Sequence, residues 1–236
     1  MDTSKQKYIV LTGAGRGIGY QLSGTFAASD VKLLAIVRDK TSLDELTSKY
    51  PSRIIPVEYD LEGLLTDEDT LPELIRQHVP QVDILLNNAG LLVNQPFGTQ
   101  TTADMQKLFA VNYMVPAILT RLLIPLLQKA GGHVVNIVSM GGFQGSVKFD
   151  GLSHYSASKG ALAVLTECLA SEYGATGIRV NALALGAVQT EMLQAAFPGY
   201  QAPVSAAQAA SFIADFAFNG HRFFNGKILP VSLSTP

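Results

Sequence analysis

The chain has 236 residues, 47% apolar and 15% charged, with 17 basic and 19 acidic side chains that leave a net charge of −2. This length and apolar content suit one sizeable core, so we expect a single domain over residues 1–236. The balanced charge provides no strongly basic surface, which argues against a nucleic-acid partner and against binding to an anionic membrane surface.

The cysteine content and the N-terminal sequence indicate the compartment. Cys168 is the only cysteine, which excludes an intrachain disulfide and favours a reducing compartment, and its apolar neighbours predict that it packs in the core. Lys5 and Lys7 precede only a short apolar run at 8–11, far below the length of a signal-peptide core or a membrane span. We therefore expect a cytoplasmic protein with no membrane association.

Short runs rich in β-branched residues alternate with longer stretches of helical periodicity, which predicts a parallel sheet with crossover helices. We expect strands near 7–12, 31–37, 53–58, 82–87, 132–138, 178–183 and 227–231. We expect helices near 17–28, 41–49, 67–78, 102–129, 152–174, 190–196 and 205–218. The predicted fold class is α/β, a Rossmann-type doubly wound parallel sheet of about seven strands with helices on both faces. In such sheets ligands bind beyond the carboxyl ends of the strands.

The helix expected at 102–129 is apolar around most of its circumference. Such a helix is buried on more than one side, so one side is expected to face the sheet. The other side faces either a second subunit, which would make the protein a homodimer, or loops of its own chain. Pro116 and Pro125 are expected to kink the helix without ending it, because the apolar periodicity continues past both.

A glycine-rich turn, Thr-Gly-Ala-Gly-Arg-Gly-Ile-Gly over 12–19, joins the first expected strand to the first helix. Glycines let the backbone turn tightly and approach a pyrophosphate at the helix N-terminus, so this turn predicts a dinucleotide site. The spacing G-x-x-x-G-x-G departs from the familiar G-x-G-x-x-G, and the alternative is a turn that only packs the helix on the strand. The expected cofactor contacts in the turn are Gly13, Gly15, Arg16, Gly17, Ile18 and Gly19.

The end of the second expected strand bears on the choice of dinucleotide. A basic residue there pairs with the 2′-phosphate of NADP, whereas an acidic residue binds the ribose hydroxyl of NAD. If the strand ends at Val37, Arg38 is placed for the phosphate, and Arg16 can approach it from the other side. A shift of one or two residues would give the site to Asp39. The sequence favours NADP, with NAD as the alternative.

A second set of polar residues has the spacing of a catalytic site. Tyr155 and Lys159 lie four residues apart near the start of an expected helix, so both side chains can project into one cleft. Ser139 closes the preceding strand, Asn112 lies in the long helix, and Asn-Asn-Ala-Gly over 87–90 follows the fourth strand. The pattern Tyr-x-x-x-Lys alone is common, and its value comes from these neighbours.

In this order, the glycine turn, Asn-Asn-Ala-Gly, Asn112, Ser139 and Tyr-x-x-x-Lys resemble the single-domain short-chain dehydrogenase/reductase family over nearly the whole chain. The resemblance implies a nicotinamide cofactor and hydride exchange with an alcohol or ketone. It implies that Tyr155 is the general acid/base, Lys159 its activator and a ribose ligand, Ser139 the group that orients the substrate oxygen, and Asn112 the support for the lysine and a proton-relay water. It further implies cofactor contacts from Asp60, Leu61, Asn88, Ala89, Gly90, Gly186, Val188 and Thr190.

The acid–base chemistry is plausible on physical grounds. A phenol titrates near pH ~10, and bringing its pKa to neutrality requires roughly 4 kcal/mol in favour of the phenolate. A cation ~4 Å away at an effective dielectric of ~20 supplies about that much. We therefore expect Lys159 to lower the pKa of Tyr155.

Some residues depart from the family pattern. Leu185 stands where the family has a proline before Gly186, the substrate lid at about 187–204 is short, and the C-terminal residues 230–234 lack the usual Asp-Gly-Gly. These departures leave a tetramer in doubt, while a homodimer through the two long helices stays plausible.

The segments expected to line the cleft carry mainly apolar side chains, with Lys148 as the one charged candidate anchor, so an apolar or aromatic carbonyl substrate is predicted. Alternatively, these side chains only pack the lid against the core. No metal is expected, because the four histidines lack metal-ligand spacing. The apolar side chains are Leu91, Leu92, Met140, Phe143, Phe149, Met192 and Phe197.

The predicted function is an NADP-dependent oxidoreductase that acts on a small-molecule carbonyl or alcohol. A non-catalytic NADP(H)-binding protein that senses redox state or acts by protein contact is the alternative from another class, and a pure binder needs no proton donor such as Tyr155. Dehydration or epimerisation on the same scaffold stays open.

Overall fold

The computed structural model describes residues 6–233, so Ser234 in the altered C-terminal sequence lies outside the described residues. The strands are β1 (Lys7–Thr12), β2 (Val31–Val37), β3 (Ile54–Glu58), β4 (Ile84–Asn87), β5 (His133–Ser139), β6 (Arg179–Leu185), β7 (Val188–Gln189), β8 (Val204–Ser205) and β9 (Ile228–Val231). The α-helices are α1 (Gly17–Ala27), α2 (Lys40–Lys49), α3 (Thr70–His78), α4 (Thr102–Phe109), α5 (Val115–Ala130), α6 (Ser153–Tyr173), α7 (Glu191–Ala196) and α8 (Ala206–Asn219). Short helical turns are η1 (Leu61–Leu65), η2 (Phe97–Thr99), η3 (Ala110–Met114), η4 (Met140–Gly142), η5 (Gly174–Thr176) and η6 (Gly220–Arg222).

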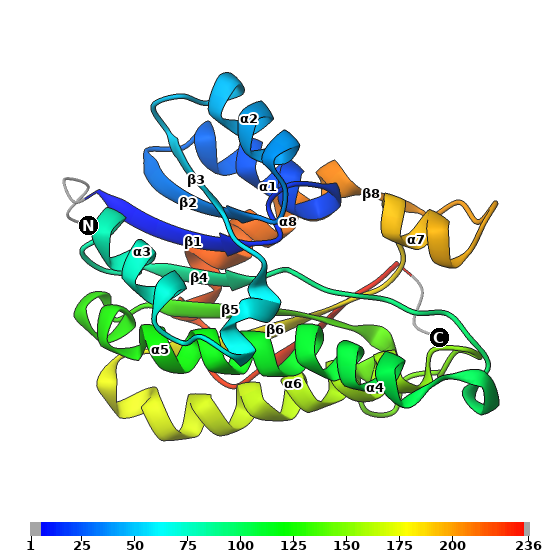
Figure 1. The fold of residues 1–236 in the computed structure, drawn as a ribbon. Helices are drawn as coiled ribbons and strands as arrows, with labels where there is room; N and C mark the ends of the chain where they lie inside the picture. Colours follow the sequence, from blue (N-terminus) through cyan, green and yellow to red (C-terminus); the bar gives the residue numbers. More distant parts are fainter. Residues whose placement is uncertain (1–5, 234–236) are drawn as a thin grey trace.

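Seven strands form one sheet in the order β3-β2-β1-β4-β5-β6-β9, and every neighbouring pair is parallel. The order reverses between β1 and β4, which places a ligand crevice beyond the carboxyl ends of these two strands. Figure 1 shows α1, α2 and α8 on one face of the sheet and α3, α5 and α6 on the other. The predicted doubly wound α/β fold is confirmed.

The core has two layers because successive residues of each buried strand face opposite sides. Ile9 and Leu11 of β1 belong to the apolar cluster that includes Phe26 of α1. Val10, between them, belongs to the cluster that includes Ile75 of α3 and Leu119 of α5. The near-continuous apolar runs of the inner strands therefore come from burial on both faces.

The predicted long helix is continuous from Thr102 to Ala130, and its middle segment η3 is a π-helix in which the Val115 amide donates to the Ala110 carbonyl. Pro116 has no amide hydrogen to give to the residue four positions earlier, which favours such a local change of helical pitch. Pro125 lies on an exposed position of α5, and the helix continues past it. By length and composition the helix could cross a membrane, yet half of its most apolar window is buried inside the domain.

The segment at 187–204, expected from the sequence to form a substrate lid, is the part of the fold that the sequence pattern predicted least well. Its two-residue strands β7 and β8 pair in parallel and form a separate small sheet, with α7 between them. Figure 1 shows α7 projecting beyond the carboxyl ends of the large sheet. Only α7 had been expected in this segment.

Candidate active site

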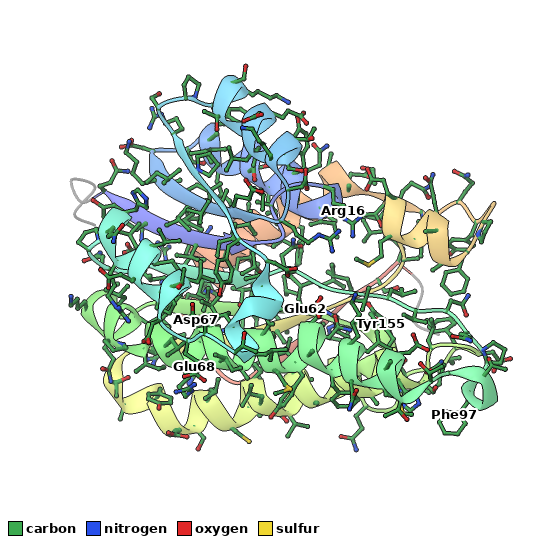
Figure 2. All side chains as sticks on the ribbon, viewed as in Figure 1. Arg16, Glu62, Asp67, Glu68, Phe97 and Tyr155 are labelled. Carbon is green, nitrogen blue, oxygen red and sulfur yellow. The ribbon has the colours of Figure 1, made fainter. Side chains whose placement is uncertain are left out.

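A cavity of about 570 Å³ lies at the carboxyl ends of the strands. Figure 2 shows Arg16 and Tyr155 on the side of the sheet from which α7 projects. Asn112 is fully buried and lines no part of the cavity. The cavity does bring together all the other predicted site residues, namely Gly13, Gly15, Arg16, Gly17, Ile18, Gly19, Arg38, Asp60, Leu61, Asn88, Ala89, Gly90, Ser139, Tyr155, Lys159, Gly186, Val188 and Thr190.

The glycine turn is held against the loop that follows β4. Gly13 has a φ of 67°, and a Cβ there would lie 2.9 Å from the Ala89 Cα, so a side chain is excluded by both conformation and space. The Asn88 side-chain amide donates to the carbonyls of Thr12 (3.1 Å) and Gly13 (3.2 Å). Arg16, at the N-cap of α1, makes no side-chain cap, so the first amides of the helix are left for an anionic ligand.

Strand β2 ends at Val37, which puts Arg38 in the first position after the strand. Asp39 caps α2, because its carboxylate accepts hydrogen bonds from the Ser42 amide (2.9 Å) and the Ser42 hydroxyl (3.0 Å). These bonds from Ser42 lower the pKa of Asp39. Arg16 and Arg38 are both exposed, line the cavity and form no salt bridge with any residue in 6–233.

Tyr155 lies in the first turn of α6, and Ser139 lies at the end of β5. Burial raises the pKa of Tyr155, and the contact of its hydroxyl with Ser139 offsets part of that rise. The Ser139 hydroxyl in turn accepts a hydrogen bond from the Gly141 amide (3.2 Å). The phenol is therefore protonated at neutral pH and can donate a proton to an oxygen bound in the cavity.

Lys159 is only 4% exposed, and its ammonium donates to the Ile137 carbonyl (2.8 Å). Burial lowers its pKa to about 8. The sequence predicted that Lys159 lowers the pKa of Tyr155. In the structure the pKa of Tyr155 is raised, because burial is its largest cause, and no effect of Lys159 on this pKa is resolved. The ammonium is directed to the backbone of β5 while it still lines the cavity.

Asn112 forms hydrogen bonds to the loop after β4 and to α6. Its Oδ1 accepts from the Leu91 amide (2.8 Å), and its Nδ2 donates to the Leu91 carbonyl (2.8 Å) and the Ser158 hydroxyl (3.0 Å). Ser158 donates to the Tyr155 carbonyl (2.7 Å). The asparagine thus joins the loop after β4 to the turn of α6 that carries Tyr155, and neither Leu91 nor Ser158 was predicted in this role.

Gly90 lets two side chains approach this loop. A Cβ at position 90 would lie 3.3 Å from the Lys159 Nζ and 3.4 Å from the Asn112 Oδ1, so a larger residue would press on both. This close approach explains why a glycine is needed at the end of Asn-Asn-Ala-Gly.

Apolar side chains form part of the cavity wall. Leu91 and Phe143, expected to line the cleft, do not line it; Leu91 is bound to Asn112 through its backbone, and Phe143 packs against the small apolar cluster that contains Met140. Lys148 is no anchor for a substrate, because its ammonium donates to the Phe143 carbonyl (2.7 Å) and the Ser146 hydroxyl (2.8 Å). The apolar and aromatic lining residues from these segments are Leu92, Met140, Phe149, Leu152, Met192, Phe197 and Tyr200.

Leu185, in place of the family proline, ends β6 in register with Val231 of β9. The following Gly186 donates its amide to the Val231 carbonyl (2.9 Å), and a Cβ on Gly186 would lie 2.5 Å from the Ser232 Oγ. The glycine is therefore required by the close approach of the C-terminal segment. Within residues 6–233 no group of three His, Cys, Asp or Glu side chains is placed to hold a metal ion.

Comparisons with known proteins identify the family of this chain. A sequence profile described as short chain dehydrogenase matches residues 7–201. The chain is 33% identical over 191 residues to an L-xylulose reductase of Caenorhabditis elegans, covering 79% of this chain and 73% of the relative. It is 35% identical over 191 residues to a galactitol 2-dehydrogenase (L-tagatose-forming) of Cereibacter sphaeroides, covering 77% of this chain and 71% of the relative.

Solved structures extend the likeness to the whole fold. A 3-ketoacyl-(acyl-carrier-protein) reductase from Brucella melitensis complexed with NADH superposes with a TM-score of 0.86 at 26% identity, covering 95% of this chain and 96% of that chain. ElxO with NADP bound gives a TM-score of 0.83 at 25% identity, covering 96% of this chain and 97% of that chain. With the profile match over most of its length, this chain belongs to the short-chain dehydrogenase family of oxidoreductases.

Proposed function

We propose that the protein is an NADP(H)-dependent oxidoreductase that transfers a hydride between the cofactor and the carbonyl or alcohol carbon of a small molecule. The observation that carries the proposal is that Ser139, Tyr155 and Lys159 line the same cavity as the glycine turn. The amides at the start of α1 suit a pyrophosphate, and the exposed Arg16 and Arg38 suit a 2′-phosphate. NADPH, when bound, supplies the hydride.

The protein's own groups handle the proton in this proposal. Tyr155, protonated at neutral pH because burial raises its pKa, gives its proton to the substrate carbonyl oxygen. The Ser139 hydroxyl donates a hydrogen bond to the same oxygen as negative charge develops on it. Lys159, still charged below a pKa of about 8, provides the positive charge behind the phenol and binds the cofactor ribose. A protonated phenol suits the reductive direction.

The proposed substrate is a neutral apolar or aromatic carbonyl compound. The cavity end near Tyr155 is lined by Phe149, Phe197 and Met192 among other apolar side chains, and Lys148 is held by backbone and hydroxyl groups outside it. We also propose that the chain folds as a single domain and that residues 187–204 form a lid over the substrate. The protein is further proposed to be a homodimer in the cytoplasm.

Replacing Tyr155 with phenylalanine tests catalysis, since it removes the proton donor and keeps the ring. We expect the kcat for ketone reduction, followed by NADPH absorbance, to fall at least ~100-fold, with NADPH affinity within about threefold of wild type. Tyr173→Phe, at the far end of the same helix, is the matched control and should retain full activity. If the wild-type protein binds NADPH but turns over no compound in a broad panel of ketones and alcohols, the protein is a cofactor-binding sensor instead.

Replacing Arg38 with alanine tests the choice of cofactor. Loss of a charge-assisted bond to phosphate should raise the Kd for NADPH about 10- to 100-fold and leave the Kd for NADH unchanged. Arg53→Ala is the control, because Arg53 pairs with Asp30 on the surface (3.0 Å) and does not line the cavity. Tighter binding of NADH than of NADPH by the wild-type protein would contradict the NADP assignment.

A further inference from the structure

Three loops, far apart in sequence, form the apolar end of the cavity. The loop after β4 contributes Leu92, the loop after β5 contributes Phe149 and Leu152, and the lid contributes Phe197 and Tyr200. A pocket built from three separate loops keeps its shape only if something fixes them relative to one another.

Asn94 joins the first of these loops to the lid. Its Nδ2 donates to the Ala196 carbonyl (2.8 Å), across 102 residues of sequence. Ala196 is the last residue of α7, where carbonyls lack donors within the helix, so the side-chain amide supplies a partner that the helix cannot. Phe197, the next residue, lines the cavity.

The other side of Asn94 rests on the loop after β5. A Cβ at Gly151 would lie 2.1 Å from the Asn94 Oδ1, and Gly151 has a φ of 79°, so only glycine fits there. The neighbouring Gln95 amide donates to the Gly151 carbonyl (3.0 Å), and the Gln100 side-chain amide donates to the same oxygen (3.2 Å). Asn94 is therefore positioned where all three loops meet.

We propose that Asn94 is a positioning residue that holds the C-terminal end of α7 so that Phe197 closes the substrate end of the cavity. The proposal rests on the proposed reductase function of this cavity. Asn94 does not line the cavity itself, so it acts through the lid. Hydrogen bonds that do not involve Asn94 hold the part of the lid nearer the cofactor residues. The Thr190 hydroxyl accepts from the Leu193 amide (3.2 Å), and the Gln189 side-chain carbonyl accepts from the Ala202 amide (2.7 Å).

Two variants test this role. Asn94→Ala removes the side-chain amide, and Asn94→Asp keeps its shape but replaces the donor with a carboxylate that faces the Ala196 carbonyl. With a neutral aromatic ketone that the wild type reduces, both variants should raise KM about five- to tenfold, change kcat less than about twofold and leave the Kd for NADPH unchanged. The control is Asn219→Ala, which removes a half-buried asparagine that is paired with Asp215 (2.9 Å) and does not line the cavity.

Hydrogen exchange provides a readout that does not depend on turnover. In the NADPH-bound protein, amides of 193–203 should exchange faster in both Asn94 variants, with protection of the sheet unchanged. An Asn94→Asp variant with wild-type KM and wild-type protection of these amides would overturn the proposal. If the wild-type protein reduces no carbonyl compound, the reductase proposal fails, and the exchange experiment still decides whether Asn94 holds the lid.

Discussion

Lys159 is buried, and burial disfavours the charged form of its ammonium group. Its ammonium is 4% exposed and bonded to the Ile137 carbonyl, and its pKa falls to about 8. Below that value the group is charged and can bind a ribose or support a phenolate, and above it the charge is lost. In the proposed mechanism, the lysine therefore makes cofactor binding depend on pH near 8.

This property predicts a pH-dependent affinity. The Kd for NADPH, measured by fluorescence titration from pH 6.5 to 9.5, should rise as the pH passes about 8, because the free protein loses the Lys159 charge there. In Lys159→Met the affinity should be weaker at low pH and the step should vanish. Lys129→Met, a change on the exposed end of α5, should keep the wild-type profile. A flat wild-type profile would contradict the role of Lys159.

Glu191 brings a negative charge to the phosphate end of the cavity. Its Oε2 lies 3.5 Å from the position that a Cβ on Gly17 would take, at the first residue of α1, and no hydrogen bond or salt bridge engages the carboxylate within the described chain. A carboxylate here repels a pyrophosphate by roughly 1 kcal/mol at ~4 Å in a water-like dielectric.

Removing this charge should strengthen cofactor binding. We expect Glu191→Gln to bind NADPH about fivefold more tightly than wild type at low salt, with the difference shrinking toward 1 M salt because ions screen the repulsion. Glu172→Gln, on the exposed side of α6, should behave as wild type at every salt concentration. Equal or weaker binding by the Glu191 variant would show that the carboxylate moves away when the cofactor binds.

The sequence predicted the cavity residues that belong to local motifs better than those whose contacts depend on the path of loops. Tyr155, Lys159 and the glycines have fixed spacing within one turn or one helix, so their presence at one cavity could be predicted from sequence alone. The bond of Asn94 to Ala196 and the position of Glu191 beside Gly17 depend on the path of two loops, and no periodicity marks either residue. The raised pKa of Tyr155 likewise depends on burial, which the motif does not show.

The strands and long helices were predictable because each is a buried apolar run of sufficient length. The π-helix over 110–114 and the two-residue strands β7 and β8 were not predictable, because these segments are too short to show a hydrophobic periodicity. Pro116 was expected to kink the helix, and a wider π-helical turn that contains Asn112 lies just before it.

At the opposite end of the sheet from the cavity, β5 begins with a buried histidine. The His133 Nδ1 lies 3.0 Å from the Ala217 carbonyl, and its Nε2 lies 3.1 Å from the Asn181 side-chain amide, so the neutral ring donates through Nδ1 and accepts at Nε2. The pKa of His133 falls from 6.5 to about 4, chiefly because of burial, with a smaller lowering from His221 at 5.5 Å and an opposing rise from the bond to the Ala217 carbonyl.

This histidine should make the fold sensitive to acid. The unfolded chain binds a proton at His133 from pH 6.5 downward while the folded chain does not until about 4, so the free energy of unfolding should fall across that window, by up to roughly 3 kcal/mol. Above pH 6.5 this contribution is complete. Urea unfolding at several pH values should give a shallower slope of the free energy of unfolding against pH for His133→Gln than for wild type. His78→Gln, at an exposed position, should retain the wild-type slope.

At the scale of the whole molecule, α6 and the long helix each leave a large apolar side chain exposed on the surface. Val164 is 59% exposed and Met114 43% exposed, and no loop within residues 6–233 covers them. Cys168 is exposed on the same helix as Val164, one turn further along, so the expectation that it packs in the core was wrong. Of the two alternatives for the long helices, this exposure favours a second subunit over the chain's own loops.

We expect a homodimer that pairs through this surface. Sedimentation should give a dimer mass for the wild type and a monomer mass for Val164→Glu, because a buried unpaired charge opposes association. Phe212→Glu, which places the same charge on the exposed side of α8, should stay dimeric if the protein is no larger than a dimer. A dimeric Val164 variant would place the interface elsewhere.

The cap that Asp39 makes on α2 limits how the coenzyme preference could be redesigned. Exchanging Arg38 for a neutral residue would remove attraction for a phosphate without creating a site for two ribose hydroxyls, since the nearest acid already serves Ser42 through both oxygens. An NADH-preferring version would need the Asp39 carboxylate released from Ser42, and α2 would then begin without its cap.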